Sequence, residues 1–213
     1  MSTHKLAEPE LAAVEVSGLT RQSFLMRGAI AAGSVYGLSA VGPFVSQALA
    51  QGGDSPLEVL NFALTLEYLE AAFYQRAVKQ VPGMSGEVKR LATTIRDNEA
   101  EHVAALMATI KQMGGKPVKA PTVAFGNGFS SQSRFLGLAQ TFEDTGVSAY
   151  NGAAPALQSE PKLLAAAGSI VQVEARHAAA IRQLNGKPIT DGAFDRTLSK
   201  GQVLGRVKPF VKA

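Results

Sequence analysis

Four long stretches of this chain repeat apolar residues at the spacing of an α-helix and end at proline or glycine. The first stretch follows Ser55, Pro56 and Glu58, which form a capping box with proline at the first helical position. Gly152 and Pro155 are expected to distort the last turns of the third helix. No alternating β pattern of useful length competes, so the sequence predicts an all-α four-helix bundle. The expected helices cover about 56–80, 86–113, 131–157 and 161–184.

The connections between these helices differ in length. A few residues join the first helix to the second and the third to the fourth, as antiparallel hairpins require. About sixteen residues, "GKPVKAPTVAFGNGFSS", join the second to the third. Fully extended, this segment reaches roughly 50 Å, which is enough to run the length of a helix. We therefore expect a bundle over residues 51–186 with a long crossover between two hairpins, followed by a basic tail over 187–213 with a short helix.

Composition narrows the kinds of site that the chain can hold. It has no cysteine, which excludes disulfide scaffolds, thiolate zinc sites, iron–sulfur clusters and rubredoxin-type iron. The last 27 residues carry six basic and two acidic side chains, which accounts for the formal net charge of +4. Scattered lysines in a tail are ordinarily solvated, and no basic stripe is interleaved with aromatic residues. Nucleic acid is therefore not an expected partner, and any metal must be bound by Glu, Asp and His.

The first 50 residues have the pattern of an export signal. The stretch "TRQSFLM" (20–26) is similar to the twin-arginine motif, but it is an Arg-Gln variant with Gln22 in place of the second arginine. An uncharged apolar run follows and closes on Ala48-Leu49-Ala50, an A-x-A cleavage pattern. We expect cleavage after Ala50 and a periplasmic or extracellular protein. The alternative is an uncleaved membrane anchor over 29–50, which is nearly long enough to span a bilayer.

Both histidines beyond His4 follow a glutamate by three positions. His102 follows Glu99 in "EAEH", and His177 follows Glu174 in "EARH". Positions three apart lie on one face of a helix, so each pair can direct a carboxylate and an imidazole at one point. A lone histidine on an apolar face is more often a hydrogen-bonded core residue than a ligand. Two such pairs, together with further glutamates, favour a shared metal site.

The first and third helices each supply a further glutamate. Glu67 is followed seven residues later by Tyr74, and Glu143 is followed seven residues later by Tyr150. Each glutamate therefore shares a helical face with a tyrosine, and the chain has a weak internal duplication of one hairpin. The tyrosines are either one-electron relays or packing residues whose hydroxyls bind ligand carboxylates. Glu70, one turn beyond Glu67, is either a substitute ligand or an outer neighbour of the site.

Burying four carboxylates and two imidazoles together is too costly unless cations neutralise them, because desolvation and repulsion add up. Two divalent ions would balance the four carboxylates, and oxygen with imidazole ligands suits iron or manganese. At these residues the sequence resembles the ferritin-like superfamily of di-metal carboxylate four-helix bundles. The resemblance implies two ions bound by Glu67, Glu99, His102, Glu143, Glu174 and His177. In that superfamily the glutamates at the positions of Glu99 and Glu174 bridge the two metals.

The resemblance extends beyond the ligands. The pattern "LNxxLxxE" (60–67) and the tyrosine seven residues after that glutamate are similar to bacterioferritins. With its leader and its segment "AFDRTLSKGQVLGRVKPFV", the chain looks most like exported bacterial ferritin-like domain proteins, which include desiccation-related proteins. Asn98 stands where bacterioferritins have an acid, and the basic tail has no counterpart in storage cages, so an iron-storing shell is not expected. Glu101 and Arg176 should point away from the site, and Asp144 should either bind a ligand side chain or be solvated.

The resemblance implies an exported di-iron or dimanganese protein that acts on peroxide or dioxygen, or oxidises ferrous ions, in stress protection. A peroxidase without cysteine would need an external electron donor, whereas peroxide disproportionation, as in the dimanganese catalases, would not. The alternative is a non-catalytic structural or desiccation-related protein whose metals only stabilise the bundle. Outer helix faces rich in alanine and glycine are compatible with a homodimer.

Overall fold

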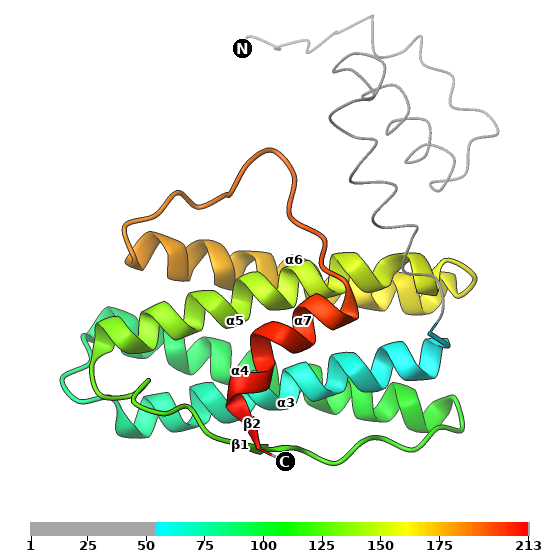
Figure 1. Cartoon of the computed structure of the whole chain (residues 1–213), viewed down its shortest axis with the longest axis horizontal. Coiled ribbons are helices and arrows are strands. Elements are labelled where there is room, and N and C mark those ends of the chain that lie inside the picture. Colours follow the sequence, from blue (N-terminus) through cyan, green and yellow to red (C-terminus); the bar gives the residue numbers. More distant parts are fainter. Residues whose placement is uncertain (1–53, 213) are drawn as a thin grey trace, which may run out of the picture. The chain divides into compact units, whose positions relative to one another are not determined.

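Two antiparallel helix hairpins pack into a four-helix bundle in the computed structural model, which describes residues 54–212 (Figure 1). Helices α3 (Pro56–Gln80) and α4 (Gly86–Gln112) form the first hairpin, and α5 (Gln132–Ala153) and α6 (Pro161–Leu184) form the second. The expected export signal, its cleavage site and the alternative anchor lie outside the described residues. Within residues 54–212, every helix is too short or too polar to cross a membrane.

The helix ends follow local signals in the sequence. Ser55 accepts a hydrogen bond from the Glu58 amide, and the Glu58 carboxylate accepts one from the Ser55 amide, as a capping box requires. Gly83 adopts a φ of 60° in the turn between α3 and α4, a conformation that favours glycine. Helix α5 ends at Ala153 and continues as the 3₁₀ helix η1 (Ala154–Leu157), with Pro155 near its start. The expected distortion of these last turns is therefore confirmed.

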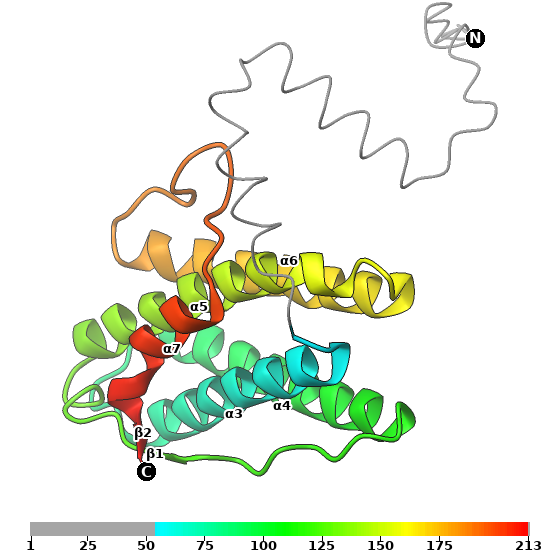
Figure 2. The same ribbon diagram turned by 45° about the vertical axis from the view of Figure 1, so that its right-hand side comes forward.

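The segment between α4 and α5 returns along the length of the bundle, so α5 begins at the end of the bundle where α4 began (Figure 1 and Figure 2). This is the predicted crossover. It contains strand β1 (Thr122–Val123), which pairs antiparallel with β2 (Val211–Lys212) near the C-terminus. The sequence did not predict these strands, because two residues are too few to show an alternating pattern.

The tail after α6 includes a short helix, α7 (Lys200–Val207), followed by the 3₁₀ helix η2 (Lys208–Phe210). Helix α7 packs on α5 through Val203 and Val207, which are buried. Just before α7, the Leu198 amide donates to the Ser148 carbonyl of α5 at 3.0 Å. The apolar side chains of α7 thus attach the tail to the bundle, while its lysines remain exposed.

The interior of the bundle has two apolar clusters with polar residues between them. One cluster surrounds Phe73, whose ring contacts four other phenylalanines within 5.4 Å between centroids, including Phe135 and Phe142. The other lies toward the start of α3 and includes Leu64 and Leu106. Along each of the four helices, a buried glutamate falls between the two clusters. The candidate site is therefore a polar layer enclosed by apolar packing at both ends.

Candidate metal centre

All four helices of the bundle contribute to the buried polar layer. The four carboxylates lie on different helices and have no exposed surface, whereas the two imidazoles are 9% and 5% exposed. The structure thus brings together all six side chains expected from the sequence: Glu67, Glu99, His102, Glu143, Glu174 and His177. Their role as metal ligands stays a prediction. The geometry of the six side chains can be compared with what a pair of metal ions would require.

The six side chains form two groups, in each of which the candidate ligand atoms lie within 4.8 Å of one another. One group contains Glu67 and His102, and the other contains Glu143 and His177. Glu99 and Glu174 belong to both groups. This sharing is what two bridging carboxylates between a pair of ions require, and it matches the bridging positions that the superfamily resemblance implies.

Both imidazoles direct Nδ1 at carboxylate oxygens. His102 Nδ1 lies 3.0 Å from Glu174 Oε1 and 3.2 Å from Glu67 Oε2. His177 Nδ1 lies 3.1 Å from Glu99 Oε1 and 3.3 Å from Glu143 Oε2. The two rings are 6.4 Å apart between centroids. With Glu99 near His102 and Glu174 near His177, each nitrogen is surrounded by oxygens from three helices rather than paired with one partner.

Several of these converging atoms are buried without a hydrogen-bond partner among the described residues. They are Glu99 Oε1, Glu143 Oε2, both oxygens of Glu174, and His177 Nδ1. The atoms around His177 are close in distance but lack the alignment of a hydrogen bond. A buried polar atom left unpaired costs roughly 1–3 kcal/mol, so five such atoms in one place need another binding partner. Oxygen and imidazole ligands in two groups fit two divalent ions, and the cluster is compatible with a di-metal site.

Burial and mutual repulsion shift the protonation of the carboxyls in the metal-free layer. Desolvation raises the pKa of Glu67 to about 7, although the hydrogen bond from His102 opposes the shift. Desolvation, followed by the charges of neighbouring glutamates, also raises the pKa of Glu70, and burial raises those of Glu143 and Glu174. The layer therefore holds protons that metal ions would displace.

The pKa values of the two imidazoles are also raised, but by the neighbouring carboxylates and against the effect of burial. Burial disfavours the charged form of His102, but the nearby carboxylates of Glu174, Glu67 and Glu99 outweigh it and raise the pKa of His102 to about 12. For His177, burial likewise opposes the charge, and the nearby carboxylates of Glu143 and Glu99 raise its pKa to about 10. The carboxylates thus stabilise the positive charge of two imidazolium ions, and the same carboxylates would attract other cations.

Each tyrosine of the duplicated pattern binds the glutamate of the other hairpin. The Tyr150 hydroxyl of α5 donates to Glu67 Oε1 of α3 at 2.5 Å, and the Tyr74 hydroxyl of α3 donates to Glu143 Oε1 of α5. The sequence placed each tyrosine on the face of the glutamate in its own helix and offered a carboxylate bond as one of two roles. The bonds cross between α3 and α5, so they orient the carboxylates and join the two hairpins.

Asn98 was not identified as a site residue from the sequence. Its side-chain amide lies 2.9 Å from His177 Nε2, the ring nitrogen that faces away from the carboxylates. When Nδ1 binds a metal, Nε2 carries the hydrogen, and the Asn98 amide can present its oxygen as the acceptor. Such a contact fixes the orientation of the imidazole ring. The position of Asn98 one helical turn before His102, on the flank of the same face, was the available signal.

Glu70 lies outside both groups of candidate ligands, so its alternative role as a substitute ligand stays a prediction. It is 3% exposed and lies beside Gly146 of α5, where an added Cβ would be 3.2 Å from Glu70 Oε1 and 3.5 Å from Glu174 Oε2. Gly146 is the counterpart of Glu70 in the duplicated pattern, three residues after Glu143. The absence of a side chain at 146 leaves the room that Glu70 occupies.

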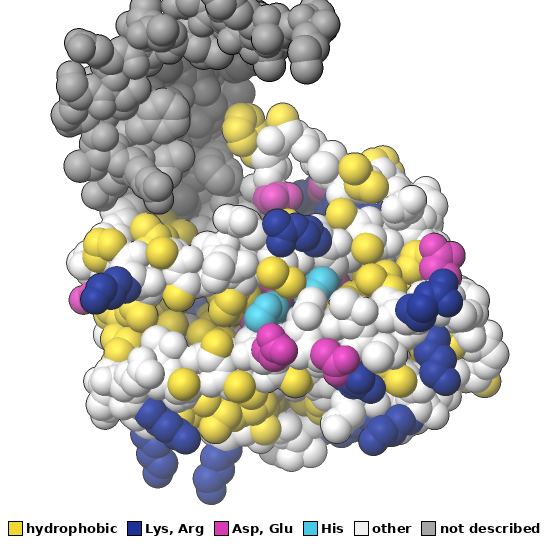
Figure 3. All heavy atoms as spheres, turned by 180° about the vertical axis from the view of Figure 1, so that it is seen from behind, with side chains coloured by type: hydrophobic (Ala, Val, Ile, Leu, Met, Phe, Trp, Pro, Cys, Tyr) yellow, Lys and Arg dark blue, Asp and Glu magenta, His cyan; other side chains and the backbone are white. Residues whose placement is uncertain are grey.

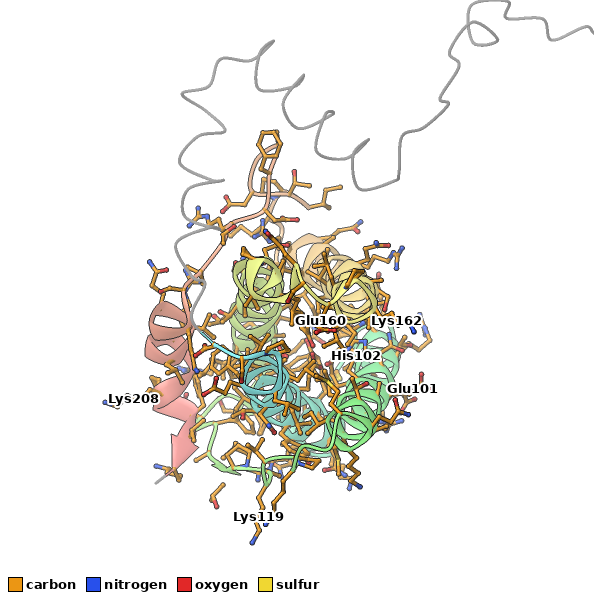
Figure 4. All side chains as sticks on the ribbon, turned by 90° about the vertical axis from the view of Figure 1, so that its right-hand side faces the viewer. Glu101, His102, Lys119, Glu160, Lys162 and Lys208 are labelled. Atoms are coloured by element: carbon orange, nitrogen blue, oxygen red, sulfur yellow. The ribbon has the colours of Figure 1, made fainter. Side chains whose placement is uncertain are left out.

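Neighbours of the candidate ligands face outward, as expected. Glu101 and Arg176 are exposed, and Figure 4 shows Glu101 on the outer side of α4 while His102 lies toward the interior of the bundle. Asp144 neither binds a candidate ligand nor is simply solvated, because it pairs with Arg182 at 2.8 Å. Figure 3 shows the two histidine rings reaching the surface of one face, beside acidic side chains.

Comparisons with known proteins agree with this architecture. The chain matches the ferritin-like domain family over residues 55–187. Among solved structures, it is similar to the crystal structure of ferritin-like, diiron-carboxylate proteins from Bacillus anthracis str. Ames. That match has 22% sequence identity and a TM-score of 0.54, and it covers 60% of this chain and 93% of that chain, which shows a shared fold. No curated protein matches the chain. Because the family match spans more than half of the sequence, the chain belongs to the ferritin-like domain family.

Proposed function

We propose that this chain is a di-iron or dimanganese protein that acts on peroxide or dioxygen, or oxidises ferrous ions, in stress protection. The observation that carries the proposal is the set of five unpaired buried atoms in a layer of four glutamates and two histidines. When bound there, two redox-active ions would supply the exchange of two electrons with a small oxidant. Four ionised carboxylates would balance the charge of two divalent ions.

The side chains divide the work of holding such a pair. Glu99 and Glu174 would bridge, because each belongs to both groups. Glu67 with His102, and Glu143 with His177, would complete one group each. Carboxylate and imidazole ligands of this kind need outer partners that fix their orientation.

Those outer partners are present for three of the candidate ligands. Tyr74 and Tyr150 donate their hydroxyl hydrogens to Glu143 and Glu67 and hold one oxygen of each carboxylate in place. Asn98 contacts the outer nitrogen of His177. The tyrosines are thus positioned to orient ligands, and one-electron transfer through their rings is a further role that this arrangement allows.

The residues of the chain indicate how water is kept out of one end of the layer and where electrons for a reaction would come from. The phenylalanine cluster around Phe73 closes one end of the layer and excludes water there. The sequence contains no cysteine and so no rubredoxin-type donor of its own. A peroxidase reaction would therefore draw electrons from an external reductant, whereas disproportionation of peroxide would need none.

A second candidate function is a structural, desiccation-related role. The observation that favours it is the burial of the four carboxylates, which have no exposed surface. In that case the ions would join α3, α4, α5 and α6 and stabilise the bundle without turnover.

Metal analysis of the purified protein, followed by assays of peroxide consumption and ferrous ion oxidation, separates the candidates. Two bound ions with turnover support the first proposal, and two ions without turnover leave the structural role. The double variant Glu99→Ala/His177→Ala should lose metal binding under both. Its matched control is Glu101→Ala/Arg176→Ala, which changes outward-facing residues of the same two helices and should keep the metal. Wild-type protein without metal after reconstitution would refute both candidates.

We further propose that the protein is exported and acts as a homodimer in the periplasm or outside the cell. The support for export is the Arg-Gln variant of the twin-arginine motif and the cleavage pattern at residues 48–50. N-terminal sequencing of the protein from the exported fraction should begin at Gln51. Retention of the full chain in the membrane fraction would favour the anchor, and light scattering of the purified protein would give its mass in solution.

A further inference from the structure

An apolar cavity of about 120 Å³ lies between the two hairpins, next to the polar layer. It is lined by the first half of α3 and α6 and by the last half of α4 and α5, which meet at the end of the bundle that faces the viewer in Figure 4. Leu60, Leu106 and Ile170 form part of its wall. Its mouth includes Ala105 of α4 and Ala166 of α6, both of which are exposed. The small alanine side chains leave this space open between helices that have few contacts with each other.

The polar side chains that line this cavity are already satisfied. The Thr109 hydroxyl donates to the Ala105 carbonyl at 2.8 Å, and the Ser169 hydroxyl donates to the Ala166 carbonyl at 2.7 Å. The Tyr150 hydroxyl donates to Glu67. Its lining includes no Asp, Glu, Lys, Arg or His. The hydroxyl hydrogens are already donated and no charged group lines the cavity, so water, peroxide or an ion would gain few partners, whereas an apolar molecule would contact mostly apolar side chains.

The cavity is also adjacent to the candidate metal ligands. Tyr150 lines the cavity with its ring and binds Glu67 with its hydroxyl, so one side chain connects the two places. Ala63 lines the cavity one helical turn before Glu67 on α3. A molecule in the cavity would therefore lie against the outer partner of a ligand carboxylate, not in the layer itself.

We propose that this cavity is a binding site for a small, uncharged, apolar organic molecule of about the size of benzene. Cavities of roughly 150 Å³ lined by apolar side chains stay dry and bind benzene or xenon, and this one is slightly smaller. The site differs in chemistry from the metal centre, since its lining includes no carboxylate and no imidazole. Molecules bound here would be presented beside Tyr150.

Titration of the purified protein with benzene, followed by the methyl signals of Leu106 and Ile170 in NMR spectra, tests the proposal. Saturable binding at one site is expected, with xenon as a second probe that perturbs the same signals. The variant Ala105→Leu should weaken benzene binding by roughly tenfold or more, because the larger side chain takes up the space that the ligand fills. Ala104→Leu is the matched control, since Ala104 is exposed on the same helix and does not line the cavity.

A leucine at the exposed position 105 can turn toward solvent, so the facing helix supplies a second variant. Ala167→Leu should weaken binding in the same way, and Ala165→Leu, at an exposed position outside the lining, should not. Absence of benzene and xenon binding, or binding that neither Ala105→Leu nor Ala167→Leu weakens, overturns the proposal. Tighter binding of octanoate than of benzene would also overturn it, because the occupant would then be an acyl chain.

The titration is run on metal-free and metal-loaded protein. Benzene binding to a protein that holds no metal would leave this site standing while the proposed redox function fails. A protein that binds two metals and turns over peroxide but does not bind benzene would support the redox function and refute this binding site.

Discussion

Replacing Tyr150 with phenylalanine should destabilise the metal-loaded protein. The change keeps the ring, which packs in the apolar cluster, and removes only the hydroxyl that donates to Glu67 Oε1 at 2.5 Å. Both residues are buried, so the carboxylate oxygen cannot recover the bond from water. A hydrogen bond to a charged group contributes about 1.5–3 kcal/mol, which is the expected loss in the free energy of unfolding. For a domain of this length, the melting temperature should fall by about 3–12 °C.

Thermal unfolding followed by circular dichroism measures this loss, with Tyr68→Phe as the matched control on α3. The Tyr68 hydroxyl donates to the sulfur of Met107 at 3.2 Å in a half-buried position. A thioether is a weak acceptor, so its loss should cost less than about 1 kcal/mol. Tyr74→Phe, which removes the bond to Glu143, should resemble Tyr150→Phe. If both of these variants melt within 1 °C of Tyr68→Phe, the crossed bonds do not stabilise the carboxylates and the reasoning is wrong.

Two other perturbations test the electrostatics and the packing of the layer. The pKa values of Glu67 and His177 are raised to about 7 and about 10, so the folded metal-free protein binds more protons than the unfolded chain. The melting temperature of the metal-free protein should fall as pH rises from about 4.5 to 7, because of Glu67, and from about 6.5 to 10, because of His177. Metal loading should release these protons and remove the decline. A melting temperature of the metal-free protein that does not change over this pH range would contradict the assignment. Gly146→Ala should destabilise the protein relative to Gly137→Ala, because a Cβ at 146 meets Glu70 at 3.2 Å whereas one at 137 meets nothing within 4 Å. Calorimetry that finds equal stability for these two variants would show that Glu70 moves freely.

Much of the bundle follows from interactions that are local in the sequence. The capping box at Ser55 and the proline at the first helical position define where α3 begins, and Pro155 ends the regular α-helix of α5. The spacing of three residues between Glu99 and His102 places both on one face of α4 whatever else surrounds them. The length of the segment between α4 and α5 decided that it could run back along the bundle.

Other features depend on how the hairpins meet. The sequence placed Tyr74 on the face of Glu67, but its hydroxyl bonds to Glu143 of the facing helix α5. Seven residues of helix rise by about 10.5 Å, so Glu67 lies two turns away along α3. The contact of Asn98 with His177 joins α4 to α6, and the spacing of Asn98 from His102 within α4 does not indicate that its partner is on another helix. The two-residue strands β1 and β2 form only because the C-terminal segment reaches the crossover.

The sequence by itself therefore determined the four helices, their connections and the six side chains that converge, since helical period and capping act within a few residues. Only the tertiary structure decided which tyrosine holds which carboxylate, how Gly146 makes room for Glu70, and that an apolar cavity lies beside Tyr150. These depend on the distance and register between helices that are far apart in the chain. Packing sets both quantities, because the hydrophobic effect favours burial without specifying direction, whereas side-chain volumes decide which atoms finally meet.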